Sequence, residues 1–209
     1  MVGELRIYVE GGGDGKDSKA EMRRGFVEFL RGARDLARDQ RIKWHIIACG
    51  SRNNTFDDFV TAIRTHTGAF NVLLVDSEGP VREGDGPWAH LFGTENGWRD
   101  RNPKIGNEHC HLMVQMMEAW VVSDLDALRK FYGPEFNENP IPRDVNIERV
   151  DKGRLDSALK EATRNTSKGE YRKIRHGAKL LTKIDPEKVR HRAPHCDRLF
   201  VTLTAKLSG

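Results

Sequence analysis

An unbroken apolar segment, Asn71 to Asp76 (NVLLVD), is the feature that most constrains the fold of this chain. A short run without polar alternation is typical of a strand that is buried on both faces of a parallel sheet. The segments Glu4 to Glu10 (ELRIYVE), Lys43 to Cys49 (KWHIIAC) and His111 to Met116 (HLMVQM) also have strand character. Parallel strands need long crossover connections, so we expect a helix between successive strands.

Helical patterns occupy the expected connections. Between Ser18 and Ala37, apolar residues recur at three- and four-residue spacing, which predicts one helix with a face against the sheet. A second helix is predicted from Thr55 to Thr65, capped by Thr55 or Asn54. A third helical stretch begins with Glu118 to Val122, and a new helix start is predicted at Ser123 or Asp124. Alternating strands and helices predict an α/β fold, a doubly wound and mostly parallel sheet flanked by helices.

The last third of the chain has a different character. After Gly133, a proline-rich connector leads into charged segments that predict helices at Arg154 to Ala162, Lys173 to Lys183 and Asp197 to Lys206. A chain of 209 residues is of a size that forms one domain. We therefore expect a single domain, with an α/β core over residues 1–132 and a basic helical extension over residues 133–209.

Composition indicates a soluble protein with a charged surface. Charged residues make up 32% of the chain, hydrophobic residues 37%, and no apolar run approaches the roughly 20 residues of a membrane-spanning helix. With no signal-peptide pattern at its start, the expected location is the cytoplasm. The formal charge is +4, and the excess is concentrated between Lys152 and Lys206, where a polyanion would bind. The three cysteines are too scattered for a disulfide framework or a metal knuckle.

Three carboxylates are predicted at strand ends, where ligands bind in open α/β sheets. Glu10 closes the first strand, Asp76 closes the third, and Glu78 follows two residues later, so extended backbone would point both acids to the same side. Clustered carboxylates repel one another unless a cation neutralises them, and hard oxygen ligands suit Mg²⁺ or Mn²⁺. The alternative is that these acids cap helices or face solvent.

The glycines after the first strand do not form a standard nucleotide-binding loop. Counting back five residues from Gly15 reaches Glu10 rather than the glycine of a Walker A loop, and Asp17 stands where that motif has Ser or Thr. The dinucleotide spacing fails as well, because it requires a glycine at Lys16. From Ser77 to Asn107 a further long insertion, rich in Gly and Pro, is expected to be a functional lid or poorly ordered.

The acids in IYVEGGGD and LLVDSEGP resemble those of the TOPRIM domain of topoisomerases, primases and OLD-type nucleases. More narrowly, VEGGGD, ACGSR, LLVDSEGP, HLMVQMMEAW, YRKIRHGAKLL and DPEKVRHRAPHCDRLF resemble a bacterial family catalogued as a domain of unknown function. That family is similar to the RloB group and is associated with ATPase partners in phage defence, so the resemblance implies such a partner and role here. This chain has D-S-E where many TOPRIM domains have D-x-D, which leaves one or two metal ions open.

The resemblance implies a TOPRIM-like fold and a role for each acid. Glu10 would be general base or ligand, Asp76 and Glu78 metal ligands, and Glu118 a further acid from the fourth strand. For Glu118, an ordinary acid facing a helix dipole is an equal alternative. The resemblance also singles out Lys173, which would steady charge in the transition state.

A basic stretch near the end of the chain is suited to a nucleic-acid backbone. It contains Lys168, Arg172, Lys173, Arg175 and His176, and Tyr171 within it would supply a stacking ring. Arg52, in a loop that opens a helix, would contact phosphate. A solvated helix face and an ordinary surface arginine are the corresponding alternatives.

The leading hypothesis is a metal-dependent nuclease acting on DNA or RNA, with an ATPase partner that presents or licenses the substrate. Two other functions remain open at this point. One is primase-like nucleotidyl transfer, for which the same acids would bind the magnesium of a triphosphate. The other is a non-catalytic subunit that binds nucleic acid or a partner protein through the basic end of the chain. A homo-oligomer is compatible with each of these functions.

Overall fold

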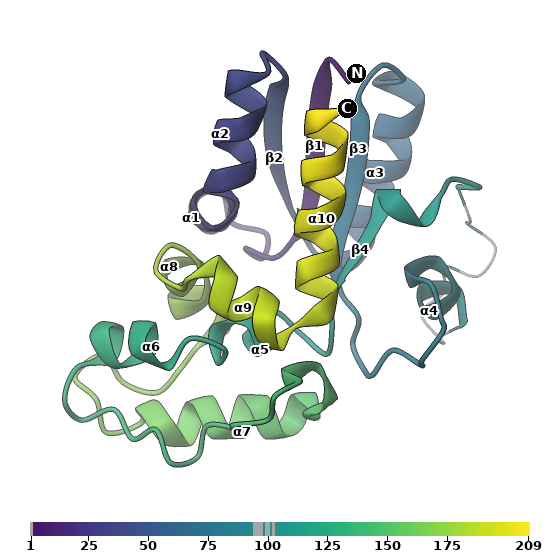
Figure 1. The fold of residues 1–209 in the computed structure, drawn as a ribbon. Coiled ribbons are helices and arrows are strands. Elements are labelled where there is room, and N and C mark those ends of the chain that lie inside the picture. The colour runs from purple at the N-terminus through teal and green to yellow at the C-terminus, as the bar shows by residue number, and fades with distance from the viewer. Residues whose placement is uncertain (1, 94–97, 99–100, 102) are drawn as a thin grey trace.

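The computed structural model describes residues 2–93, 98, 101 and 103–209 (Figure 1). Its centre is a parallel sheet of the strands β1 (Glu4–Glu10), β2 (Lys43–Gly50), β3 (Phe70–Asp76) and β4 (Cys110–Met113). The strand order is β2-β1-β3-β4, and every neighbouring pair runs parallel. This confirms the prediction of an α/β fold with a parallel sheet flanked by helices.

The strand order creates a switch point between β1 and β3. After β1 the chain moves to one side of the sheet to form β2, and it then returns past β1 to form β3 on the other side. The two connections lie on opposite faces of the sheet, and open α/β sheets bind ligands outside the carboxyl ends of the strands at such a point. Ile7 in the middle of β1 pairs with Ile46 of β2 and with Val72 of β3, which sets the register.

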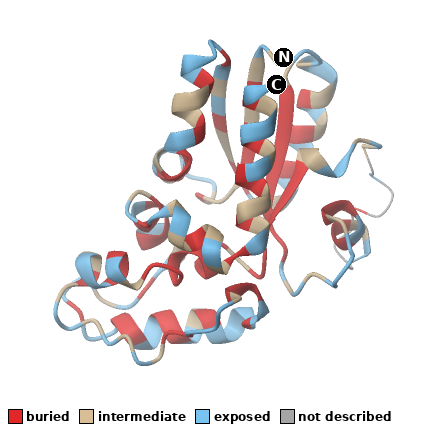
Figure 2. Cartoon of the chain, in the orientation of Figure 1, coloured by how far each residue is buried: buried red, intermediate tan, exposed pale blue. Residues whose placement is uncertain are grey.

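Helices cover both faces of the sheet. On one face lie α1 (Lys16–Phe29), α2 (Arg31–Asp39) and α10 (Pro194–Ser208) (Figure 1). The other face carries α3 (Arg52–Thr65) and α4 (Pro87–Gly93). All seven residues of β3 are buried (Figure 2). Their side chains alternate between two hydrophobic clusters, one on each face of the sheet, which explains why the run lacks polar alternation.

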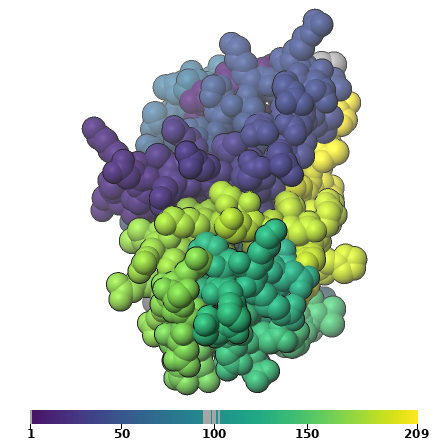
Figure 3. Space-filling model, turned by 90° about the vertical axis from the view of Figure 1, so that its left-hand side faces the viewer, coloured from purple at the N-terminus to yellow at the C-terminus, as the bar shows by residue number. Residues whose placement is uncertain are grey.

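The remaining helices lie beyond the carboxyl ends of the strands (Figure 1). They are α5 (Glu118–Val121), α6 (Leu125–Tyr132), α7 (Lys152–Thr163), the π-helical segment η3 (Lys173–Gly177), α8 (Ala178–Leu181) and α9 (Pro186–Arg192). Within the described residues there are also two short 3₁₀ turns, η1 (Asn107–His109) and η2 (Ile147–Arg149). The helical part packs directly against the sheet part (Figure 3). A Cβ atom at Gly25 of α1 would lie 2.8 Å from the carbonyl oxygen of Ala178, so only glycine allows this approach of α1 to α8.

Several element boundaries differ from those predicted. The single helix expected from Ser18 to Ala37 is two helices, because the chain turns at Leu30. Helix α3 starts earlier than expected, and its N-cap is Ser51, whose hydroxyl accepts a hydrogen bond from the Asn54 amide at 3.3 Å. Strand β4 ends at Met113 rather than Met116, since Gln115 adopts a left-handed conformation with φ of 65°.

The helix predicted from Lys173 to Lys183 starts with a π turn and ends at Leu181, and α9 was not predicted. Part of the insertion after β3 forms α4, and Trp88 and Trp98 within it are buried in the second hydrophobic cluster. The expectation of a lid or poor order also covers residues 94–97, 99–100 and 102, which lie outside the described residues. Among the described residues, no helix is both long and apolar enough to cross a membrane.

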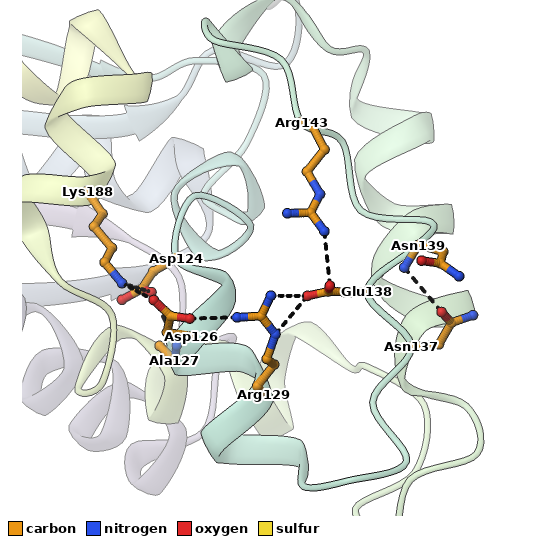
Figure 4. Close-up of polar contacts among 9 residues, drawn as sticks. All are labelled: Asp124, Asp126, Ala127, Arg129, Asn137, Glu138, Asn139, Arg143 and Lys188. Carbon is orange, nitrogen blue, oxygen red and sulfur yellow. Dashed lines mark hydrogen bonds and ion pairs between the residues drawn. The ribbon is translucent and has the colours of Figure 1, made fainter.

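A polar network joins α6 to α9 and to the connector that follows α6 (Figure 4). The buried carboxylate of Asp124 caps α6 by accepting from the Ala127 amide at 3.2 Å, and it also accepts from the Asp185 amide at 2.9 Å. The Lys188 ammonium lies 2.9 Å from Asp124 and 2.7 Å from the exposed Asp126. Asp124 therefore connects the ends of two helices that are 61 residues apart in the sequence.

We expect Asp124→Ala to lower the free energy of unfolding by about 2–3 kcal/mol, because it removes a helix cap and leaves the Asp185 amide without an acceptor. Urea denaturation followed by circular dichroism measures this change. The control is Asp126→Ala, which removes the exposed partner of the same lysine and should leave the denaturation midpoint almost unchanged. Equal effects of both substitutions would contradict the structural role of Asp124.

Candidate metal and phosphate site

The three predicted carboxylates converge at the switch point. Glu10 ends β1, Asp76 ends β3, and Glu78 follows in the loop after β3. One carboxylate oxygen from each residue lies within 4.8 Å of the other two. The sequence placed each acid at a strand end, and the sheet order makes two of those ends neighbours.

Backbone hydrogen bonds hold two of the acids in place. The Glu10 carboxylate accepts from the Asp76 amide at 3.1 Å, which ties the end of β1 to the end of β3. Asp76 is buried and accepts from the Met117 amide at 2.9 Å, which ties β3 to the start of α5. A register shift between Val9 and Glu10 marks the end of regular pairing, and Gly11 continues with φ of 125°, a conformation that favours glycine.

Glu78 reaches the site by a different route from the one predicted. We expected extended backbone to point Asp76 and Glu78 to the same side, but β3 ends at Asp76 and Glu78 has a left-handed φ of 63°. The turn between them is fixed by Ser77, whose hydroxyl donates to the Gly79 carbonyl at 2.5 Å and accepts from the Gln115 amide at 2.8 Å. A non-glycine residue in this region is strained, and such strain persists where the surroundings hold it, as at ligand sites.

Two lysines from the helical part neutralise the acids. The Lys173 ammonium lies 2.7 Å from Asp76 and 3.7 Å from Glu118. The Lys152 ammonium, at the start of α7, lies 2.8 Å from Glu78. The site is therefore built jointly by the sheet and by the helical part.

Lys173 was predicted from the sequence, whereas Lys152 was not. A signal was present, because a lysine in the first turn of a helix opposes the helix dipole and is stabilised by a nearby anion. Lys152 directly follows Asp151, which caps α7 by accepting from the Gly153 amide at 2.8 Å.

Glu118 lies beside the acidic cluster rather than within it. The resemblance had implied an acid from the fourth strand, but Glu118 is the first residue of α5. Its side chain is buried, with 1% of the residue exposed. One carboxylate oxygen accepts from the Tyr171 hydroxyl at 2.8 Å, while the other has no hydrogen-bond partner among the described residues. Burial raises the pKa of Glu118, an effect that Lys173 opposes.

The electrostatics of the cluster are those of crowded carboxylates. Burial and then the adjacent Asp76 carboxylate raise the pKa of Glu10 from its ordinary 4.5 to about 8, against the opposite influence of Lys173 and Arg52. The pKa of Lys173 is raised above its ordinary value, because attraction to Asp76 and Glu118 outweighs the effect of burial. Both raised pKa values show that the acidic cluster favours a neighbouring positive charge.

The donor set could hold a metal ion. Three carboxylates each offer one hard oxygen ligand, and these oxygens lie within 4.8 Å of one another. These residues form the one such group of acids, histidines and cysteines found in the described part of the chain. The cysteines are buried and unpaired, and burial raises the pKa of each thiol, so they are not ligands here.

The predicted nucleic-acid contacts divide into two groups. Lys168, Arg172 and Arg175 are exposed and remain available to a polyanion. His176 is 2% exposed, and its Nδ1 accepts from the Arg172 amide at 3.2 Å and lies 3.1 Å from the Tyr132 hydroxyl, so it cannot contact a backbone phosphate in this conformation. Tyr171 is 1% exposed and bound to Glu118, so the expectation of a stacking ring is also wrong. The apolar surroundings of both side chains could not be read from a local basic pattern.

Arg52 occupies the start of α3, next to the acids. Its guanidinium stacks on the buried Trp98 ring at 4.9 Å. Together with Ser51, Asn53, Glu78 and Lys152, it lines a surface pocket. The sequence predicted Arg52 at a loop that opens a helix, and the structure places it beside Glu78 rather than on an unrelated surface.

In metal-free buffer, Glu10→Gln should raise the thermal midpoint, and the gain should grow with pH. Because folding raises the pKa of Glu10 to about 8, the folded protein holds an extra proton between about pH 4.5 and 8 and loses stability as pH rises through that window. The variant lacks this loss. We expect similar midpoints at pH 5 and a gain of at least about 2–4 °C at pH 8.5, equivalent to about 1 kcal/mol.

Differential scanning fluorimetry in chelator measures these midpoints. The matched control is Glu21→Gln on the exposed face of α1, which should follow the original protein at both pH values. A Glu10→Gln variant that is unfolded, or less stable at pH 8.5, would make Glu10 a structural residue.

Sequence comparison places the chain in a family. No curated protein and no solved structure matches it, so the similarity to the RloB group and to OLD-type nucleases stays a prediction. A family model described as a domain of unknown function (DUF4276) matches residues 9–204. The match spans Glu10, Asp76, Glu78, Glu118 and Lys173. The chain therefore belongs to the DUF4276 family.

Proposed function

We propose that this protein is a metal-dependent nuclease that hydrolyses phosphodiester bonds of DNA or RNA. The observation that carries the proposal is the convergence of Glu10, Asp76 and Glu78 within 4.8 Å at the switch point of the sheet. Three clustered carboxylates are the ligand type of Mg²⁺ and Mn²⁺, which serve phosphoryl chemistry. The position is the one at which open α/β sheets bind ligands.

The residues around the cluster fit hydrolysis. When bound, a divalent ion supplies a Lewis acid that activates water and offsets the charge of a phosphoryl oxygen. Lys173 lies 2.7 Å from Asp76, so its ammonium can stabilise negative charge that develops at the same place. Glu10 is fixed by the Asp76 amide, which leaves its second oxygen for a ligand or a proton.

The surface next to the cluster fits a polyanionic substrate. Lys168, Arg172 and Arg175 are exposed and flank Lys173 in the chain. Positive groups neutralise backbone phosphates, and their placement offsets the repulsion between an acidic site and a nucleic acid. The TOPRIM-like character of the sheet, the role in phage defence and the ATPase partner belong to the same proposal and rest on the sequence resemblance.

The first test is cleavage of labelled DNA and RNA with Mg²⁺, with Mn²⁺ and with chelator. We expect products with an ion present and none in chelator. Asp76→Asn and Glu10→Gln should lower the cleavage rate by at least about 100-fold, since loss of even an outer partner of a metal ligand costs 10–100-fold. The control, Asp156→Asn on the exposed side of α7, should cleave normally. Cleavage that resists chelator, or that survives both site substitutions, would refute the proposal.

A second test separates the lysine at the site from the surface cations. Lys173→Ala should lower kcat by about 10²–10³-fold while changing affinity little, because its charge acts on the transition state. Arg175→Ala should instead leave kcat unchanged, weaken binding and reduce the salt slope by about 0.7–0.9 for one lost phosphate contact. Single-turnover kinetics and anisotropy titrations measure the two effects, with circular dichroism as the folding control. Equal effects on kcat would contradict the separate roles.

A further inference from the structure

A surface pocket adjoins the acidic cluster at Glu78. It is lined by Ser51, Arg52, Asn53, Glu78 and Lys152. The pocket shares Glu78 with the acidic cluster, but it contains none of the basic residues from Lys168 to Arg175. The two lysines that pair with the acids thus come from different elements, with Lys173 at Asp76 and Lys152 at Glu78.

The guanidinium of Arg52 has no hydrogen-bond partner among the described residues. All three of its nitrogens are buried, and none makes a hydrogen bond to any residue that the structure describes. An arginine carries five N–H donors, and a buried charge deprived of both water and partners is unfavourable. The contact with Trp98 at 4.9 Å offsets part of this cost, because the ring face attracts a cation, but it satisfies no donor.

The side chains next to Arg52 are engaged in contacts with one another. They therefore do not accept hydrogen bonds from its guanidinium. Trp98 stacks on Phe56 with 4.2 Å between ring centroids, and its indole N–H donates to Asn53 at 2.9 Å. Asn53 and Arg52 both lie in the first turn of α3, a helix of 14 residues. The free backbone amides of a helix start add positive potential to the pocket.

Lys152 supplies the second cation of the pocket. Its side chain is 47% exposed, and its ammonium pairs with Glu78 at 2.8 Å. The start of α7 and the start of α3 therefore line the same pocket, each with a cationic side chain. Arginine, lysine and a helix start are together the groups that recognise a phosphate.

We propose that this pocket binds a backbone phosphate of the nucleic-acid strand, next to the phosphate that is cleaved at the acidic cluster. This inference rests on the proposed function and specifies how its substrate is held. Arg52 would turn from Trp98 toward the pocket that it already lines and donate to the phosphate oxygens. Lys152 would exchange Glu78 for the phosphate, which frees the Glu78 carboxylate to act as a ligand.

The test measures binding without cleavage. A fluorescein-labelled 20-nucleotide single strand is titrated in chelator and low salt against the original protein, Arg52→Gln and Lys152→Gln, with fluorescence anisotropy as the readout. Each substitution should weaken binding by about 10-fold and reduce the salt slope by about 0.7, the value of one phosphate contact to a single strand. The matched control is Arg38→Gln, which removes a 72% exposed arginine at the end of α2, ahead of the amino end of β2. It should change neither quantity.

Lys152→Gln keeps the test valid if Arg52→Gln does not fold, because Lys152 is an exposed side chain on the first turn of α7. Unchanged affinity and salt slope in a folded Lys152→Gln or Arg52→Gln variant would overturn the proposal. Absence of strand binding by the original protein in chelator would overturn it as well.

A separate titration distinguishes this outcome from failure of the nuclease proposal. Mn²⁺ binding is followed by electron paramagnetic resonance in the absence of nucleic acid. Arg52→Gln should bind Mn²⁺ at least as tightly as the original protein, since it removes a positive charge near Glu10. If no variant and no original protein binds Mn²⁺, yet strand binding still depends on Arg52 and Lys152, the metal function fails and the phosphate pocket stands. If Mn²⁺ binding is normal but strand affinity depends on neither Arg52 nor Lys152, the phosphate pocket fails and the metal function stands.

Discussion

The buried carboxylate of Asp76 is the group on which the arrangement of this protein depends. It accepts from the Met117 amide, its ion pair with Lys173 spans 2.7 Å, and its own amide donates to Glu10. These contacts join β1, β3, the start of α5 and the π-helical segment η3. Burial of a charge is costly unless the charge is paired and hydrogen-bonded, so the ion pair of Asp76 with Lys173 favours contact between the sheet and the helical part at this residue.

The same requirement explains why the helical part lies at the carboxyl ends of the strands. The acids at the switch point repel one another, and the cations that offset this repulsion come from η3 and α7. Glu118 extends the arrangement inward, because the Tyr171 hydroxyl donates to it and Lys173 lies 3.7 Å away. The basic excess of the last quarter of the chain is therefore partly internal, where it balances the charge of the site, and only partly a surface for a polyanion.

Asp76 and Glu78 lie together as predicted, but the physical reason differs from the predicted one. Asp76 and Glu78 do converge, but through a left-handed turn at Glu78 held by Ser77, and not through the alternation of an extended strand. Within one basic stretch, Lys168, Arg172 and Arg175 are exposed whereas Tyr171 and His176 are interior. A local pattern shows which residues are charged or aromatic. Whether each side chain points inward or outward depends on the π-helical turn of η3 and on the residues that pack against it.

The sequence by itself determined the α/β class, the parallel strands and the position of an acid at two strand ends, because apolar periodicity and strand ends are local properties. Only the tertiary structure decided that β1 and β3 are neighbours, that Lys152 faces Glu78, and that Arg52 lies on Trp98 without a hydrogen bond to any described residue. These contacts join segments separated by tens of residues, 74 in the case of Lys152 and Glu78. These contacts are stabilised by packing and charge pairing between elements that are distant in the sequence. A short stretch of sequence therefore does not reveal them.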